Sequence, residues 1–206
     1  AGAVGEMLCN LFISQIPSLP ASNEEIMKKT AVSFGLGLQI TNISKDIVVD
    51  RGRGWSYVPR TYIESNGLTP DEFHSGRSSK NDLKVLDSLL KKTVGHLNDA
   101  LEFILAIPRS YVRIRLFCIW PLWMAMETVA ELHDNHDLLK SNANVKISRN
   151  TVKWILRRTP FICWSNNLLQ RSFSSILKTE GYDRFDNFNI EQLKERLNDL
   201  SLDNIP

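Results

Sequence analysis

Apolar residues recur at intervals of three and four along almost the whole chain of 206 residues, which is the spacing of one face of a helix. A half-buried strand would instead alternate apolar and polar residues, and no segment does so. We expect helices over residues 4–16, 22–49, 81–107 and 109–133, a further helix capped by Ser148, and weaker helical segments as far as residue 200. The sequence therefore predicts an all-α fold, in a single domain over residues 1–206 whose pattern weakens after about residue 150.

Short start and stop signals lie between these helices. Ser22 and Glu25 have the spacing of a capping box at the start of the second helix. Residues 50–59 contain arginines, glycines and a proline, and are predicted to form a loop. Thr69, followed by Pro70 and two acidic residues, predicts a further helix start. Pro121 is expected to bend its helix or to lie where a ligand approaches.

Composition excludes several classes of protein. The chain is 43% apolar and 23% charged, with a formal net charge of +2, which argues against long disorder and against a dedicated nucleic-acid-binding protein. Three widely spaced cysteines are typical of reduced thiols in the cytoplasm. No apolar run is long enough for a transmembrane helix. Because Ala1 begins within apolar helical sequence, without Met or a signal peptide, we expect further protein upstream.

The most informative segment is a row of polar residues on the second helix. At about 100° per residue, its members fall within an arc of roughly 80° on one face. The residues between them are apolar and would embed the helix among others. This polar row consists of Gln39, Asn42, Asp46 and Asp50.

Two carboxylates on a largely apolar helix require an explanation. Burying them without a cation costs free energy, because desolvation and mutual repulsion both disfavour the charged forms. Mg²⁺ in proteins usually takes one or two carboxylates together with substrate phosphates and water. The polar row therefore suggests a Mg²⁺–diphosphate site. In the alternative interpretation, Asp46 and Asp50 form an i,i+4 pair on a solvated helix end beside Lys45 and Arg51, and spacing alone does not separate the two.

Two neighbouring features favour the metal site. Gly35 and Gly37 each cost about 1 kcal/mol relative to alanine within a helix. Their presence suggests that something approaches the backbone closely there. The loop after the acidic residues supplies charge-assisted donors suited to a diphosphate, namely Arg51, Arg53 and Arg60, with Tyr57 among them.

The polar row and the loop after it resemble the second aspartate-rich motif of the squalene/phytoene synthase family, in the string Gln39-x-x-Asn42-x-x-x-Asp46-x-x-x-Asp50-Arg51-Gly52-Arg53 and then Tyr57-Val58-Pro59. Ala1-Gly2-Ala3-Val4-Gly5 is similar to the family's Val-Ala-Gly-x-Val-Gly segment. Leu116-Phe117-Cys118-Ile119-Trp120-Pro121 resembles the Phe-Cys-x-x-Pro segment of the squalene synthase branch, with a lysine-rich echo at Val145-Lys146-Ile147. The resemblance covers roughly residues 1–150.

This resemblance implies an isoprenoid-synthase type of helical bundle that lacks its N-terminal helices here. Asp46 and Asp50 would ligate Mg²⁺, with Asn42 as a further ligand and Gln39 assisting at the metal or the diphosphate. The family's first aspartate-rich motif is not in this chain. A missing N-terminal segment would therefore be needed to complete the site, and these residues alone are not expected to be active.

The resemblance also implies how a substrate is held. Arg51 and Arg53 would hold and release the diphosphate, and Lys45 stands where many relatives have arginine. Tyr57 would sit in a flap that covers the site. The pocket for the prenyl chain would be lined by Val4, Leu8, Phe34, Leu38, Phe117, Cys118 and Pro121.

The implied activity is the Mg²⁺-dependent, head-to-head condensation of two farnesyl diphosphates, through a cyclopropylcarbinyl (presqualene) diphosphate, to squalene with NADPH. The Phe-Cys-x-x-Pro segment is the reason to prefer squalene. The alternatives are phytoene or dehydrosqualene synthesis, and a non-catalytic helical scaffold or assembly protein with the same fold. Retention of the polar row counts against the scaffold.

Other features have simpler interpretations. His133 and His136 could suggest a metal site, but solvated histidines at a helix end are commoner. Cys118 lacks a neighbouring base, so a pocket or core position is preferred to a nucleophile. Residues expected in the core are Trp120, Trp123, Met124 and Met126.

The segment from Trp154 to Phe173 has two interpretations. Trp154 and Ile155 are expected on the apolar side of the helix that Ser148 caps. With Arg157, Arg158 and Arg171, the segment either packs on the domain, which is preferred, or lies on a membrane surface. The protein is accordingly expected in the cytoplasm, with the cytoplasmic surface of a membrane as the alternative.

Overall fold

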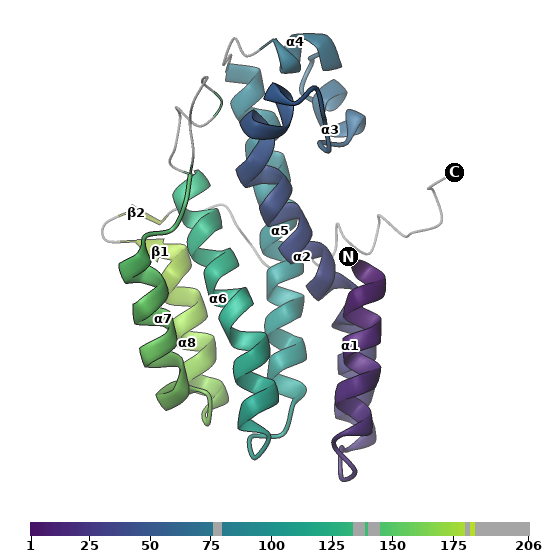
Figure 1. Ribbon diagram of the computed structural model, residues 1–206, viewed down its shortest axis with the longest axis vertical. Coiled ribbons are helices and arrows are strands. Elements are labelled where there is room, and N and C mark those ends of the chain that lie inside the picture. Colours follow the sequence, from purple (N-terminus) through teal and green to yellow (C-terminus); the bar gives the residue numbers. More distant parts are fainter. Residues whose placement is uncertain (76–79, 134–138, 140–144, 180–181, 184–206) are drawn as a thin grey trace.

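A computed structural model describes residues 1–75, 80–133, 139, 145–179 and 182–183 of the chain (Figure 1). The elements in these ranges are α1 (Gly2–Ser14), α2 (Ala21–Gly52), α3 (Arg60–Ser65), α4 (Pro70–His74), α5 (Lys80–Ala106), α6 (Val112–His133), α7 (Arg149–Ile162) and α8 (Asn166–Leu177), followed by the paired strands β1 (Lys178–Thr179) and β2 (Tyr182–Asp183). Apart from this two-residue antiparallel pair, every described element is a helix. The predicted all-α class is confirmed.

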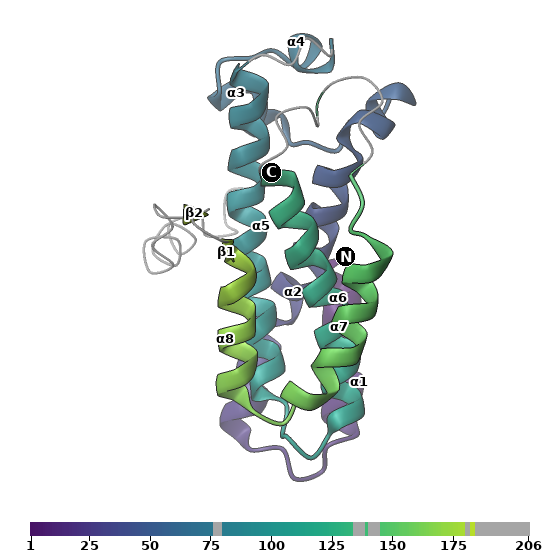
Figure 2. The ribbon, with the colours of Figure 1, turned by 90° about the vertical axis from the view of Figure 1, so that its left-hand side faces the viewer.

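The long helices lie side by side and alternate in direction (Figures 1 and 2). α2 and α5 form the centre and make the most extensive contact in the molecule. α1 packs on α2, and α6 packs on both α5 and α2. α7 and α8 form an outer layer against α6, whereas α3 and α4 cover the end of the bundle where α2 finishes. None of the helices in the described ranges combines the length and apolarity that crossing a bilayer requires.

The core lies along α5 and α6. α5 buries one continuous stripe that includes Val85, Leu89, Leu97, Leu101 and Ile104. On α6, Trp123 and Met126 are fully buried, and Trp120 and Met124 pack against the core from partly exposed positions. The indole N–H groups of Trp120 and Trp123 donate to Thr159 (3.0 Å) and Ser172 (3.2 Å), so both rings keep a polar partner on the outer helices. The predicted core role of these four residues is confirmed.

Two predicted boundaries of α2 are wrong. The Ser22–Glu25 capping box does not form, because the helix already begins at Ala21 and the Pro20 carbonyl accepts from the Asn23 and Glu24 N–H groups. Ser22 therefore lies inside the first turn, where its hydroxyl donates to the Asn23 side chain (3.4 Å). At the other end α2 continues to Gly52, so the predicted loop starts three residues later than residue 50.

Two other predicted helix starts are confirmed. Thr69 forms a complete capping box with Glu72, and Pro70 is the first residue of α4. Ser148 caps α7 by accepting from the Thr151 N–H (3.0 Å).

Glycines allow the helices around α2 to approach closely. A methyl group at Gly5 of α1 would overlap the Ala31 carbonyl of α2, and one at Gly35 would overlap the Ala1 carbonyl. At Gly37 the neighbours are Leu97 and His96 of α5. The close approach predicted at Gly35 and Gly37 is therefore made by neighbouring helices rather than by a ligand.

Ser33 lies between His96 and Asp99 where α2 meets α5. Its hydroxyl donates to Asp99 Oδ2 (2.5 Å) and lies 2.6 Å from His96 Nδ1. Since a hydroxyl has one proton, Nδ1 must donate to Ser33 and the lone pair remains on Nε2. Nε2 is buried without a hydrogen-bond partner in the described part of the chain. Burial, assisted by Lys92, lowers the pKa of His96 to about 4.

Arg115 ties three helices together from inside the core. Its side chain is fully buried, and it donates to the Ile107 carbonyl after α5 (2.5 Å) and to Asn166 Oδ1 of α8 (2.8 Å). Burial lowers the pKa of this guanidinium. The contact fixes the start of α6 against the end of α5 and the start of α8.

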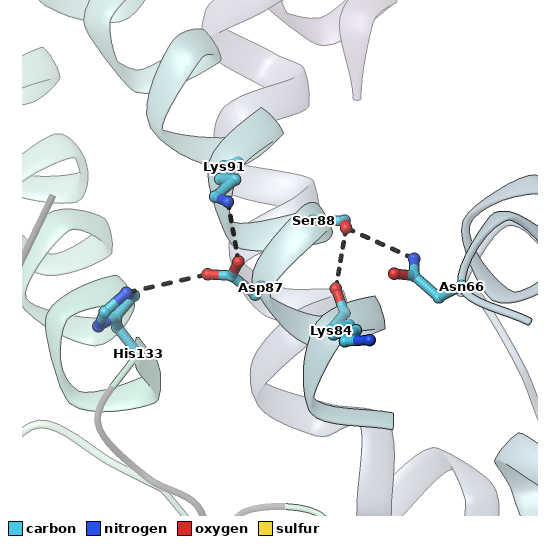
Figure 3. Close-up of polar contacts among 6 residues, drawn as sticks. All are labelled: Asn66, Lys84, Asp87, Ser88, Lys91 and His133. Carbon is cyan, nitrogen blue, oxygen red and sulfur yellow. Dashed lines mark hydrogen bonds and ion pairs between the residues drawn. The ribbon is translucent and has the colours of Figure 1, made fainter. Parts of the chain in front are cut away.

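A polar network on the surface connects α3, α5 and α6 near their upper ends (Figure 3). Asp87 pairs with Lys91 (3.0 Å) and faces His133 of α6 (3.8 Å). Asn66, the residue after α3, donates to Ser88 (3.5 Å). His133 thus faces a carboxylate of α5, while His136, its partner in the rejected metal site, lies outside the described residues.

Because α1 and α2 touch at glycines, the effect of a Gly→Ala substitution on the free energy of unfolding should depend on its position. Gly5→Ala should lower the free energy of unfolding by about 1–3 kcal/mol, because the methyl group meets backbone rather than a movable side chain. Gly52→Ala is the matched control: no heavy atom lies within 4 Å of its added methyl group, so no loss and a gain of up to about 1 kcal/mol is expected. Urea unfolding measures both, and equal effects would contradict the account.

The buried neutral His96 predicts a loss of stability in acid. Its pKa lies below the unfolded value of about 6.5, so its stabilising contribution is complete above pH 6.5 and is lost as the pH falls towards 4. The shift corresponds to about 3 kcal/mol. Unfolding of the wild type and of His96→Gln should be compared between pH 7 and pH 4. On going from pH 7 to pH 4, the free energy of unfolding of the wild type should fall by about 3 kcal/mol more than that of the variant. An equal fall in both proteins would exclude a neutral buried imidazole at position 96.

Candidate functional site

An apolar cavity of about 440 Å³ lies between α1, α2, α5 and α6. Its walls are almost entirely apolar, and they contain all seven residues predicted to line a prenyl-chain pocket: Val4, Leu8, Phe34, Leu38, Phe117, Cys118 and Pro121. The sequence places these residues on three separate helices, which the fold brings around one space. This arrangement can accept an extended hydrocarbon.

Phenylalanine rings form one wall of the apolar cavity. Phe12 meets Phe117 edge-to-face (centroids 5.8 Å apart) and also meets Phe103 (6.4 Å). Phe34 packs against Phe103 in the same manner (5.6 Å). Phe12 and Phe103 are buried, whereas Phe117 is exposed and therefore lies at the opening. Edge-to-face packing fixes the ring orientations and so gives this wall a defined shape.

Pro121 contributes to the cavity from within α6. A proline lacks an N–H, so the Phe117 carbonyl one turn earlier loses its helical donor. Cys118 lies on the same wall and is buried. Burial raises the pKa of its thiol to about 12, so the thiol is neutral at physiological pH and acts as a small apolar group. All three cysteines are free and buried.

Two members of the polar row, Gln39 and Asn42, line the apolar cavity. Both side chains are also exposed to solvent, so they lie where the cavity opens. They supply amide groups at the edge of an otherwise apolar wall. A molecule with a hydrocarbon tail in the cavity would therefore place its polar end beside α2.

Asp46 and Asp50 continue the row along α2, away from the cavity. The Asp46 side chain is 40% exposed, does not line the cavity, and pairs with Lys45 Nζ (3.3 Å). The Asp50 side chain is 15% exposed, faces Arg53 at 3.9 Å, and lines a small recess formed with Trp55 and Tyr57. The row thus runs from the opening of the apolar cavity to this recess.

The three arginines predicted to donate hydrogen bonds to a diphosphate lie in different surroundings. Arg53 remains exposed and lies over the Trp55 ring (5.6 Å from the centroid). Arg51 turns towards Leu139 and donates to its carbonyl (2.9 Å), which commits part of its guanidinium to the protein. Arg60 begins α3, is largely exposed, and faces Glu64 at 3.9 Å. Arg53 and Lys45 are therefore the cations placed most directly beside the acidic residues.

The oxygen donors of the polar row fit a Mg²⁺ ion that is also bound by substrate phosphate and water. The described part of the chain contains no group of three His, Cys, Asp or Glu side chains arranged to hold a metal. Asp46, Asp50 and the Asn42 amide are hard oxygen donors on one helix face, which suits an ion that completes its shell with substrate phosphate and water. Additional protein ligands would have to come from beyond the described residues.

Several residues around the site were not predicted. Phe12 extends the Val4–Leu8 spacing by one more turn, so the helical pattern of α1 contained a signal for it. Phe103 of α5 also lines the cavity. The sequence around it gives no comparable signal, because its position in the cavity depends on how α5 packs against the other helices. His74 lines the recess beside Asp50, where burial and then the charge of Arg51 lower its pKa.

Comparison with known proteins identifies relatives of this chain. The sequence profile described as Squalene/phytoene synthase matches residues 1–151. The squalene synthase of Candida albicans is 31% identical over 156 residues, which cover 73% of this chain and 33% of that protein. A bifunctional lycopene cyclase/phytoene synthase of Colletotrichum graminicola is 33% identical over 109 residues, which cover 52% of this chain and 19% of that protein. The chain spans about a third or less of the length of these relatives.

The fold has a solved counterpart. The squalene synthase TcSQS, in complex with the ligand E5700, matches with a TM-score of 0.71 at 21% identity, over 95% of this chain and 56% of that one. This similarity confirms the predicted isoprenoid-synthase type of helical fold. Because the profile covers well over half of its residues, the chain belongs to the squalene/phytoene synthase family, whose members are enzymes of the prenyltransferase type.

Proposed function

We propose that this chain forms the second metal-binding half of a head-to-head prenyl synthase, which condenses two farnesyl diphosphates through presqualene diphosphate to squalene. One observation supports this function most strongly. The polar row starts at the opening of an apolar cavity and continues to two carboxylates on the same helix. A prenyl diphosphate has the matching division into a long apolar tail and a compact anionic head.

The residues of α2 would act on the diphosphate. Asp46, Asp50 and Asn42 would hold Mg²⁺, which when bound neutralises the charge of the leaving diphosphate. Lys45 already pairs with Asp46 (3.3 Å), so it orients that carboxylate and adds a positive charge nearby. Arg53, exposed beside Asp50, would donate to the diphosphate oxygens as the bond to carbon lengthens.

The apolar walls would protect the reaction. Ionisation of an allylic diphosphate produces a carbocation, which water would quench. The phenylalanine wall would exclude water from the tail, and the raised pKa of Cys118 keeps a thiolate out of the cavity. Tyr57, on the loop beside Asp50, would cover the head group as part of a flap.

Squalene is the preferred product, and NADPH would then be the reductant. The preference rests on the Phe117–Pro121 segment, whose sequence is similar to that of the squalene synthase branch and of which Phe117, Cys118 and Pro121 line the cavity. Phytoene and dehydrosqualene are the alternative products, in which proton loss replaces reduction. Incubation of the full-length protein with farnesyl or geranylgeranyl diphosphate, with and without NADPH, would distinguish them by the hydrocarbon formed.

Removing either carboxylate should abolish most of the activity of the full-length protein. We expect Asp46→Asn and Asp50→Asn each to lower kcat by about a hundredfold or more, because an anionic ligand of the Mg²⁺ that would neutralise the leaving diphosphate is lost. Asp87→Asn is the matched control on α5, where the surface pair with Lys91 contributes little, and it should retain activity within about twofold. Full activity of both α2 variants would refute the metal role.

Metal removal should produce the same loss reversibly. Chelation with EDTA should abolish turnover of farnesyl diphosphate, and Mg²⁺ should restore it, because Mg²⁺ held partly by substrate phosphates and water exchanges with solution. In Asp46→Asn, half-maximal recovery should need at least about tenfold more Mg²⁺. Turnover that persists without a divalent ion would contradict the proposal. A wild type that turns over no prenyl diphosphate would instead favour the scaffold alternative.

A further inference from the structure

α7 presents an aromatic and basic face on the outside of the molecule. Its inner side is packed on α6 through Ile155, Thr159 and Ile162, as the preferred interpretation of this segment predicts. The predicted position of Trp154 on the apolar side is wrong, because its ring is exposed. Phe161, which is 82% exposed, lies seven residues later. Figure 2 shows α7 and α8 together as the outer layer of the bundle.

The spacing on α7 orders this face into a stripe with cations on both sides. Trp154 and Phe161 differ by about 20° around the helix axis, so they form one line. Arg157 lies to one side of that line and Arg158 to the other, at roughly 40–60° from Trp154. Arg158 lies over the Trp154 ring (4.6 Å from the centroid), and Lys153 and Arg157 are exposed. We call Lys153, Trp154, Arg157, Arg158 and Phe161 the aromatic–basic face.

The charge around this face is of one sign. Residues 145–176 contain six lysines and arginines and no aspartate or glutamate. Since the whole chain has a net charge of only +2, the remainder is net negative. None of the cations of the aromatic–basic face forms an ion pair with a carboxylate within the described ranges. The concentration of positive charge is therefore local, and no carboxylate of the described residues pairs with it.

The side chains of the aromatic–basic face, with Asn150, also border an open surface hollow of about 520 Å³. A hollow with cationic walls and aromatic edges offers donors for a phosphate and apolar contact for the first carbons beyond it. Trp164 and Leu168, in and after the turn between α7 and α8, are also exposed. Exposed aromatic residues between arginines and lysines are the composition of helices that lie in the plane of a membrane interface.

We propose that the aromatic–basic face of α7 docks the protein on the surface of an anionic lipid bilayer. The cations would bind lipid phosphates electrostatically, while Trp154 and Phe161 enter the boundary between head groups and acyl chains. The inference goes beyond the proposed function and does not depend on it, because docking can be measured without substrate or metal.

Vesicle sedimentation tests the proposal with the full-length protein. The protein should sediment with vesicles of phosphatidylcholine and phosphatidylglycerol (7:3) at low salt, and at least tenfold more weakly with phosphatidylcholine alone. Arg157→Glu/Arg158→Glu should lower the partition coefficient at least tenfold, since each cation near such a surface contributes substantially. Trp154→Ser/Phe161→Ser should lower it severalfold and should reduce quenching of tryptophan fluorescence by brominated lipid.

Matched control variants test whether vesicle binding depends on this face or on surface charge and apolarity in general. Lys29→Glu/Lys84→Glu changes two exposed lysines of α2 and α5 and should bind as the wild type does. Ile26→Ser removes an exposed apolar side chain of α2 and should also have no effect. Failure of the wild type to sediment with anionic vesicles, or equal losses in the control variants, would overturn the proposal. So would protection of Trp154 from acrylamide in the free full-length protein, which would show that protein covers this face.

Discussion

The close contact of α2 with its neighbours is the constraint on which the site depends. Glycines at positions 5, 35 and 37 let α1 and α5 approach the α2 backbone more closely than side chains would allow. α2 is thereby held on two sides by apolar packing, while the edge that carries the polar row remains open to the cavity and to solvent. A helix fixed in this manner can present oxygen donors in a constant direction, which binding a metal–diphosphate complex requires.

The apolar cavity and the polar row belong to the same packing arrangement. The cavity between α1, α2, α5 and α6 is lined mainly by apolar residues, and the internal proline of α6 lies on its wall. Where α2 leaves this gap, its exposed face changes from leucine and phenylalanine to amides and then to carboxylates. The same helix therefore joins an apolar space to an edge of oxygen-bearing side chains. A lipid diphosphate is the class of molecule that needs both.

Sequence reasoning predicted the helices, the family and the residues around the cavity, because each depends on spacing within one helix or on a contiguous motif. It was less successful where the outcome depended on contacts between helices. Gly35 and Gly37 indicated a close approach, yet the approaching groups belong to α1 and α5. The Ser22 capping box failed because Pro20 starts α2 earlier. Phe103 joined the cavity, and Arg51 turned to Leu139, only through tertiary packing.

The central claim is that Asp46 and Asp50 coordinate the divalent ion that binds a prenyl diphosphate. Anomalous diffraction from crystals of the full-length protein, grown with Mn²⁺ and a thiodiphosphate analogue of farnesyl diphosphate, tests it most directly. The account predicts a manganese peak at coordination distance, about 2.1–2.2 Å, from these carboxylates, with the prenyl tail in the apolar cavity. A metal bound elsewhere, with both carboxylates facing solvent and the cavity empty of the tail, would contradict it.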